Sequence, residues 1–142
     1  MKAATTWNRA ALRIVVPQLG VTEIARRLQT PPTYKSAHGE SKMRARGMWY
    51  MLSGLEFSRS LIEHIVKLTD FVRDHRVEVK ELSKIGSANL SCAFASVDDQ
   101  SSFCIGSDDL LILGEAGVYI SITLYPPNDD NVHEEEIEPS TP

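Results

Sequence analysis

The chain has 142 residues, with 42% hydrophobic and 24% charged side chains and a net charge of -4, which is ordinary composition for one globular domain. No apolar run approaches the ~20 residues that a membrane-spanning helix needs, and the N-terminus lacks the apolar stretch of a secretion signal. A chain of this length can bury a sufficient core without a metal or disulfide staples. We therefore expect a soluble, cytoplasmic protein with no membrane partner and with both thiols reduced.

The charge is unevenly distributed along the chain. Residues 126–142 carry six acidic and no Lys or Arg side chains, which leaves residues 1–125 with 15 basic and 13 acidic groups, a net +2. Within this body, residues 1–59 have a net charge of +7 and residues 60–125 one of -5. We interpret residues 1–125 as a single folded domain and residues 126–142 as an acidic, flexible tail with too few apolar residues to fold.

The first third of the chain reads as strand, helix and strand. Residues 11–16 alternate like a strand, and Thr22 is placed to cap a short helix whose apolar residues recur every three or four positions. Two prolines after that helix open a polar, basic loop over residues 31–46, the longest internal loop. Residues 47–53 have apolar side chains on both faces, which is typical of a covered strand.

The clearest helical pattern follows. Ser60, with Glu63 three residues later, forms a capping box. Apolar residues then recur at helical spacing as far as Leu82, and Gly86 supplies a C-terminal stop. Because the span is long, we expect a break near His75.

The last third predicts two strands, a short helix and a final strand. Residues 88–97 and 101–105 read as strands joined by a short hairpin loop, residues 107–113 as a brief helix with an acidic start, and residues 118–125 as a regularly alternating strand. The order βαβαββαβ predicts an α+β fold with a five-stranded mixed, mostly antiparallel sheet and helices packed on one face. Cys92 and Cys104 would then lie on opposite sides of the sheet.

The spacing of core and turn residues over most of the body is similar to that of a known family. The shared positions include Gly20-Val21-Thr22-Glu23-Ile24, Trp49-x-x-x-Ser53, Leu61-x-x-His64-Ile65-x-x-Leu68, Gly86 and Gly117-Val118-x-Ile120-x-Ile122-x-Leu124-Tyr125. This pattern resembles the bacterial domain-of-unknown-function family 4279 over residues 11–125. The resemblance implies a small bacterial α+β domain and carries no established activity to transfer.

The most functional-looking feature is the basic loop and the aromatic residues near it. The candidate binding residues are Tyr34, Lys35, His38, Lys42, Arg44, Arg46 and Trp49. Basic side chains interleaved with aromatic ones can grip a phosphate backbone and stack on bases. The net negative charge of the chain argues against nucleic acid as the partner, and the acidic tail is an alternative occupant for the loop.

No residue pattern specifies a reaction. His64 and His75 lie roughly 16 Å apart along a helix with a rise of ~1.5 Å per residue, too far to share a metal, and His64 fits a packing or capping role. The two aspartate pairs stand where turns and helix starts ordinarily place aspartate: Asp98-Asp99 and Asp108-Asp109. Zinc-ligand spacing, a phosphate-cradling glycine loop and a nucleophile elbow do not occur. We expect no catalytic residue, metal or cofactor.

Two classes of function stay open. The first is a non-catalytic protein-interaction module, such as a toxin-neutralising immunity protein or another small binding domain, with a protein partner of unknown identity. The basic first half and acidic second half also suggest a homodimer about a two-fold axis. The alternative is an enzyme with an unfamiliar site around His38, Glu40 and Trp49, which requires a pocket there. A nucleic-acid binder acting through residues 35–46 would lose affinity steeply with salt.

Overall fold

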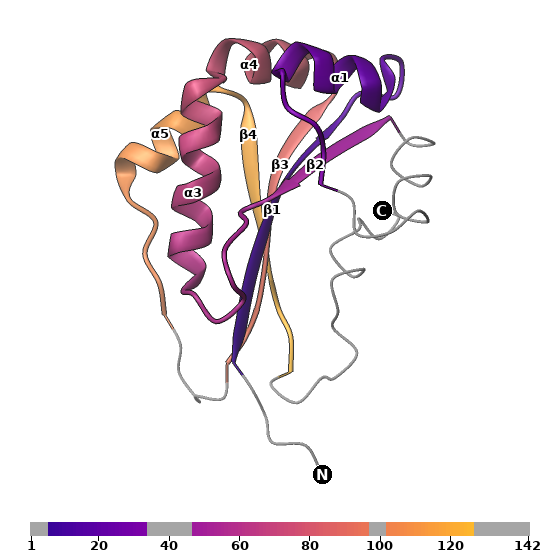
Figure 1. The fold of residues 1–142 in the computed structure, drawn as a ribbon. Helices are drawn as coiled ribbons and strands as arrows, with labels where there is room; N and C mark the ends of the chain where they lie inside the picture. Colours follow the sequence, from indigo (N-terminus) through magenta and orange to yellow (C-terminus); the bar gives the residue numbers. More distant parts are fainter. Residues whose placement is uncertain (1–5, 34–46, 97–101, 127–142) are drawn as a thin grey trace.

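The computed structural model describes residues 6–33, 47–96 and 102–126, and these contain four strands and four helices built around one sheet (Figure 1). In chain order the elements are β1 (Trp7–Val15), α1 (Gly20–Leu28), β2 (Met48–Leu52), α3 (Leu61–Asp74), α4 (Arg76–Ile85), β3 (Ser87–Ala95), α5 (Ser107–Glu115) and β4 (Val118–Leu124). The predicted α+β class is confirmed. None of the helices in these ranges is long and apolar enough to cross a bilayer.

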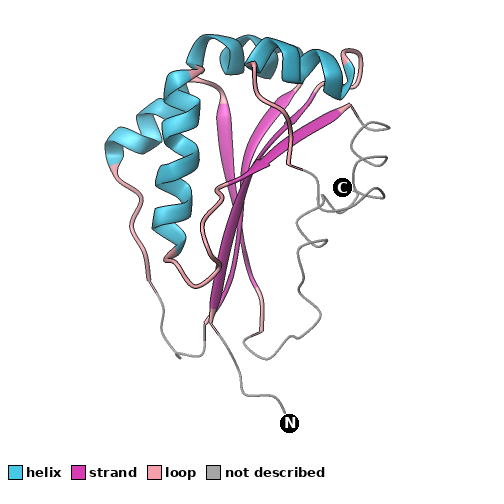
Figure 2. Ribbon diagram, viewed as in Figure 1, coloured by secondary structure: helices cyan, strands magenta, loops and turns pink. Residues whose placement is uncertain are grey.

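The four strands form a mixed sheet in the order β2-β1-β3-β4. β1 pairs antiparallel with both β2 and β3, whereas β3 pairs parallel with β4. In this register Ala11 lies between Leu52 and Ser91, and Leu90 faces Ile120. The mixed character of the sheet is therefore as predicted, and β4 stands at one end of it, on the far side of β3 from β1 (Figure 2).

The predicted strand over residues 101–105 is wrong, so the sheet has four strands and not five. Residues 102–106 have no strand conformation. β3 already pairs with β1 on one side and with β4 on the other, so it has no free side for a hairpin partner. Phe103 and Ile105 still pack against the core, and the Phe103 ring meets Phe94 edge-on at 5.9 Å between centroids. The alternation of half-buried Phe103 and Ile105 therefore resembles a strand pattern although the backbone is not a strand.

A single apolar cluster joins the helices to the sheet. It takes every second residue of the strands, such as Leu12, Leu90 and Val118, together with the inner faces of all four helices. The helix residues in this cluster include Val21, Ile24, Leu28, Leu61, Ile65, Leu68, Val72, Val79, Leu82 and Leu113. The alternate strand residues, whose side chains point to the other face of the sheet, form a smaller second cluster around Ala11, Met48 and Tyr50. This alternation is what a period of two along each strand requires.

The long predicted helix is interrupted where expected. α3 ends at Asp74 and α4 begins at Arg76, and His75 between them has φ -122° and ψ 28°, outside the helical region. At the start of α3, the Ser60 hydroxyl accepts a hydrogen bond from the backbone N–H of Glu63 at 3.3 Å, so the predicted N-cap is also confirmed.

The start of α1 differs from the prediction. The helix begins at Gly20, so Thr22 lies inside the first turn and is not the cap. The N-cap is Leu19, which offers no side-chain hydrogen bond. Instead, the backbone N–H groups of Leu19 and Gly20 both donate to the carbonyl of Val16, which ties the end of the β1 segment directly to the helix.

β1 begins at Trp7, four residues earlier than the alternating pattern suggests, because its first residues pair with the end of β3, and a neighbouring loop adds hydrogen bonds to Asn8. The N–H of Asn8 donates to the carbonyl of Phe57 at 2.8 Å, and the Asn8 side-chain amide donates to the carbonyl of Arg59 at 3.0 Å. These bonds anchor the start of β1 to the segment between β2 and α3. That segment also carries a connected group of polar side chains.

Candidate functional site

The residues predicted to bind a partner fall into two groups. Tyr34, Lys35, His38, Lys42, Arg44 and Arg46, with the alternative site residue Glu40, lie outside the described residues. Trp49 is described and is fully buried. Its indole N–H donates to the carbonyl of Thr30 at 3.0 Å, and its ring stacks on Phe71 at 5.7 Å between centroids. In this structure the Trp49 side chain belongs to the core.

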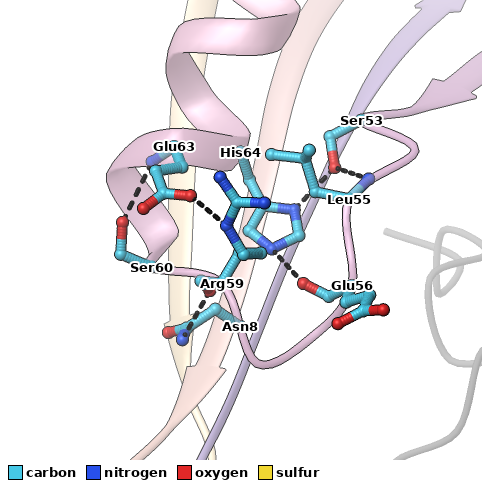
Figure 3. A network of polar contacts seen from close by, with 8 residues as sticks. All are labelled: Asn8, Ser53, Leu55, Glu56, Arg59, Ser60, Glu63 and His64. Atoms are coloured by element: carbon cyan, nitrogen blue, oxygen red, sulfur yellow. Dashed lines mark hydrogen bonds and ion pairs between the residues drawn. The ribbon is translucent and has the colours of Figure 1, made fainter.

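A Ser–His pair forms the centre of the polar network between β2 and α3 (Figure 3). Ser53 directly follows β2, and His64 lies in the first turn of α3. The Ser53 Oγ is 2.6 Å from Nδ1 of His64, and Nε2 of His64 is 3.1 Å from the carbonyl oxygen of Glu56. A carbonyl only accepts, so Nε2 carries the proton. Nδ1 of the neutral ring therefore accepts from the Ser53 hydroxyl.

The surroundings of His64 favour this neutral ring. The side chain is 1% exposed. Burial lowers the pKa of His64, and the hydrogen bond to the Glu56 carbonyl opposes that shift. The neighbouring charges, Glu63 and Arg59, pair with one another on the surface of α3 and so act on the ring as a nearly neutral unit. At neutral pH the ring is a neutral hydrogen-bonding bridge.

The remaining contacts make the network a brace for the loop. The Ser53 hydroxyl also accepts from the backbone N–H of Leu55 at 3.2 Å, which closes a tight turn after β2. Together with the Asn8 amide bound to the Arg59 carbonyl, these bonds tie β1, the loop and α3 together (Figure 3). Both ring nitrogens of His64 and the hydroxyl of Ser53 are thus engaged inside the protein.

A cavity of about 360 Å³ lies beside the network. Its polar lining residues are Arg9, Ser53, Glu56 and His64, and Phe57 contributes an apolar wall. Arg9 is only 3% exposed, and its guanidinium lies over the ring of Trp7, 5.1 Å from the centroid. This volume is at the lower end of what small-molecule pockets occupy.

Sequence reasoning did not find this pair, although each residue carries a local signal. Ser53 stands between an apolar strand and Gly54, where a turn is needed, and His64 follows the cap Ser60 by one helical turn. The contact itself depends on how the loop folds back onto α3. His75 is separate from it: the His75 Nδ1 donates to the carbonyl of Phe71 at 3.0 Å. Over the described ranges, no three His, Cys, Asp or Glu side chains gather closely enough to hold a metal.

A second surface of interest is the outer edge of β4. Among residues 6–33, 47–96 and 102–126, no strand pairs with that edge. Three large side chains of β4 are exposed, Tyr119 by 56%, Ile122 by 44% and Leu124 by 66%. The opposite edge of the sheet is different, because the N–H of Thr33 donates to the carbonyl of Tyr50 at 2.8 Å and so occupies a backbone acceptor of β2. Residues 116–126 contain no charged side chain.

Comparison of the chain with curated proteins and with solved structures finds no match. A family model described as a domain of unknown function (DUF4279) matches residues 5–127, which is nearly the whole folded body. The match extends over every described strand and helix, from the anchored start of β1 to the exposed edge of β4. The chain therefore belongs to the DUF4279 family, as the spacing of its core and turn residues indicates.

Proposed function

We propose that this chain is a non-catalytic protein-interaction module and that it binds its partner through the outer edge of β4. The observation that carries the proposal is the combination of a strand edge that no described strand pairs with and exposed apolar side chains on the same strand. An edge strand presents unpaired N–H and C=O groups that can add a strand from another chain.

The backbone geometry indicates which groups of β4 are available. The N–H of Tyr125 donates to the carbonyl of Phe94 in the β3 segment at 2.9 Å. Because successive residues of a strand direct their backbone groups to opposite sides, odd-numbered residues of β4 face β3. The backbone groups of the even-numbered residues Val118, Ile120, Ile122 and Leu124 therefore point outward.

The sequence of β4 lacks the features that usually prevent an edge strand from pairing with another chain. Edge strands are usually protected by charged side chains, prolines or bulges. β4 has none of these over Val118–Leu124, and its Ile122 and Leu124 are exposed; α5, which precedes β4, adds Leu110 and Leu111, which are 47% and 60% exposed. Exposed apolar side chains that gather on one strand favour a protein-binding role for it.

The non-catalytic part of the proposal rests on the Ser53–His64 pair. A serine hydrolase also needs a serine bonded to a neutral histidine that a third group orients, so this pair is the strongest enzymatic candidate in the described structure. Here the hydroxyl serves a turn and the histidine bridges two backbone segments. A fluorophosphonate probe tests this interpretation: we expect no adduct on Ser53 by mass spectrometry. An adduct that disappears in Ser53→Ala would establish a reactive nucleophile and overturn this part.

The interaction itself can be tested by site-specific photo-crosslinking in cells of the native host. A benzophenone amino acid at Ile122, 44% exposed on β4, is compared with the same amino acid at Val66, 38% exposed on α3. We expect a covalent protein adduct at position 122 that is absent at position 66, and the adduct should disappear when Leu124 is replaced by glutamate. Equal labelling at both positions, or none at either, would contradict the proposal.

A further inference from the structure

We propose that the partner at the β4 edge is a second copy of this chain, paired antiparallel through β4 about a two-fold axis at Ser121. This inference rests on the proposed function and names its partner. The pairing would join two four-stranded sheets into one continuous sheet, with the helices of both copies on corresponding sides.

The residue pattern of β4 is symmetric about Ser121. In an antiparallel pair of identical strands centred there, Ile120 lies opposite Ile122, and Val118 lies opposite Leu124. On the other face, Tyr119 lies opposite Thr123. The two pairs on the core face thus match apolar residues with apolar residues, the pair on the other face sets a tyrosine opposite a threonine, and all seven residues of β4 take part. Centring the axis one position earlier or later leaves two residues at one end of β4 without a partner in the other strand.

The direction of the backbone groups agrees with this register. The outward-facing residues of β4 are the even-numbered ones, as the Tyr125 bond to Phe94 indicates. An axis at Ser121 places even residues opposite even residues, so both strands offer N–H and C=O groups to each other at the same positions. Ser121 then meets its own counterpart in a pair without hydrogen bonds, where Cα atoms come within about 4.5 Å.

Charge and exposure favour a second copy over an unrelated strand. Close to a two-fold axis a charge would lie near its own duplicate and be repelled by it, and residues 116–126 carry no charge. The pairing also covers the exposed apolar side chains: Leu124 of one copy lies opposite Val118, which is 6% exposed and packs in the main core beside α5.

A disulfide placed on the axis tests the register directly. The test uses the full chain in a Cys104→Ser background, because Cys104 is exposed, whereas Cys92 is buried. Ser121→Cys should form an intermolecular disulfide under mild oxidation, since its Cα separation falls in the range that disulfides span. Thr123→Cys is the matched control. It is more exposed than Ser121, but in this register the two copies are roughly 13 Å apart, four residues at about 3.3 Å each.

Solution mass completes the test. Light scattering of the unmodified chain at tens of micromolar should give twice the chain mass of 15.8 kDa. Ile122→Pro, which removes an outward N–H and leaves the β3 side of the strand intact, should give the monomer mass with a retained folded circular dichroism spectrum. A monomer mass for the unmodified chain, or equal crosslinking at positions 121 and 123, overturns the second copy. A photo-crosslink from position 122 to a different protein would also overturn it, while the interaction module would stand.

Discussion

The Ser53 hydroxyl donates to Nδ1 of His64 at 2.6 Å, and this bond holds the turn after β2 against the first turn of α3. The two residues are eleven positions apart, and the segment between them contains the Glu56 carbonyl that accepts from Nε2 of the same ring. The segment has no regular secondary structure before α3 begins, and the neutral imidazole of His64 holds it in place through these two hydrogen bonds. Removing the His64 side chain should therefore mainly lower the free energy of unfolding.

Replacing His64 by alanine should destabilise the protein considerably. The change leaves the Ser53 hydroxyl and the Glu56 carbonyl without their partner and opens space at a side chain that is 1% exposed. We expect a loss of ~2–4 kcal/mol in the free energy of unfolding, measured by urea titration. Val66→Ala, at a position 38% exposed on the same helix, should change it by no more than ~0.5 kcal/mol. Equal effects of the two substitutions would show that the bridge contributes nothing.

The stability should also depend on pH through His64. Burial lowers the pKa of His64 below its ordinary value of 6.5, so the folded protein holds the neutral ring. The unfolded chain then binds a proton more readily, and the stabilisation that is present above the unfolded pKa is lost as pH falls through the folded pKa. We expect the urea midpoint to decrease between pH 7 and pH 5. His64→Gln keeps a hydrogen-bonding side chain without titrating, and it should flatten this decrease; an unchanged pH profile would contradict the assignment.

How far the sequence predicts this protein depends on the range over which each signal acts. The Ser60 cap and the break at His75 are local, because neighbouring residues determine them, and both were predicted correctly. The supposed strand at residues 101–105 failed because alternation around Phe103 describes which side chains are buried, not what the backbone pairs with. β3 lies between β1 and β4, which excludes a hairpin partner, and this order of strands depends on the whole topology.

The candidate sites show the same limit. Trp49 looked like part of a binding loop because it follows basic residues in the chain, yet its ring packs on Phe71 in the core. The Ser53–His64 contact was missed because nothing in the spacing of a serine and a histidine indicates that a loop will fold back between them. The edge position of β4 was equally hidden, since its regular alternation reports only one buried face and says nothing about which strands lie beside it.

The two cysteines should differ sharply in reactivity. Cys92 is buried on β3, and burial raises the pKa of its thiol to about 12, whereas Cys104 is exposed. Because the thiolate is the reactive form, Ellman's reagent should modify one thiol quickly in the native protein and the second only after unfolding in guanidinium. Cys104→Ser should remove the fast phase. Rapid modification of two thiols in the native state would show that β3 is open to solvent.

The turn before β4 depends on a glycine. Gly117 has φ +76°, and a Cβ atom there would collide with the side chain of Ser83, whose hydroxyl lies 3.1 Å from the carbonyl of Ala116. Gly117→Ala should therefore cost about 1–3 kcal/mol in the free energy of unfolding.

Gly114 is the matched control, because it lies within α5 and an added Cβ meets nothing within 4 Å. Gly114→Ala should stabilise the protein by up to about 1 kcal/mol, since alanine favours the helix. Opposite signs for two identical substitutions three residues apart would confirm that the backbone conformation, and not the loss of a glycine as such, decides the outcome. If Gly117→Ala instead leaves the urea midpoint unchanged, the turn before β4 tolerates a side chain at position 117. The close approach of Ser83 would then not restrict that position.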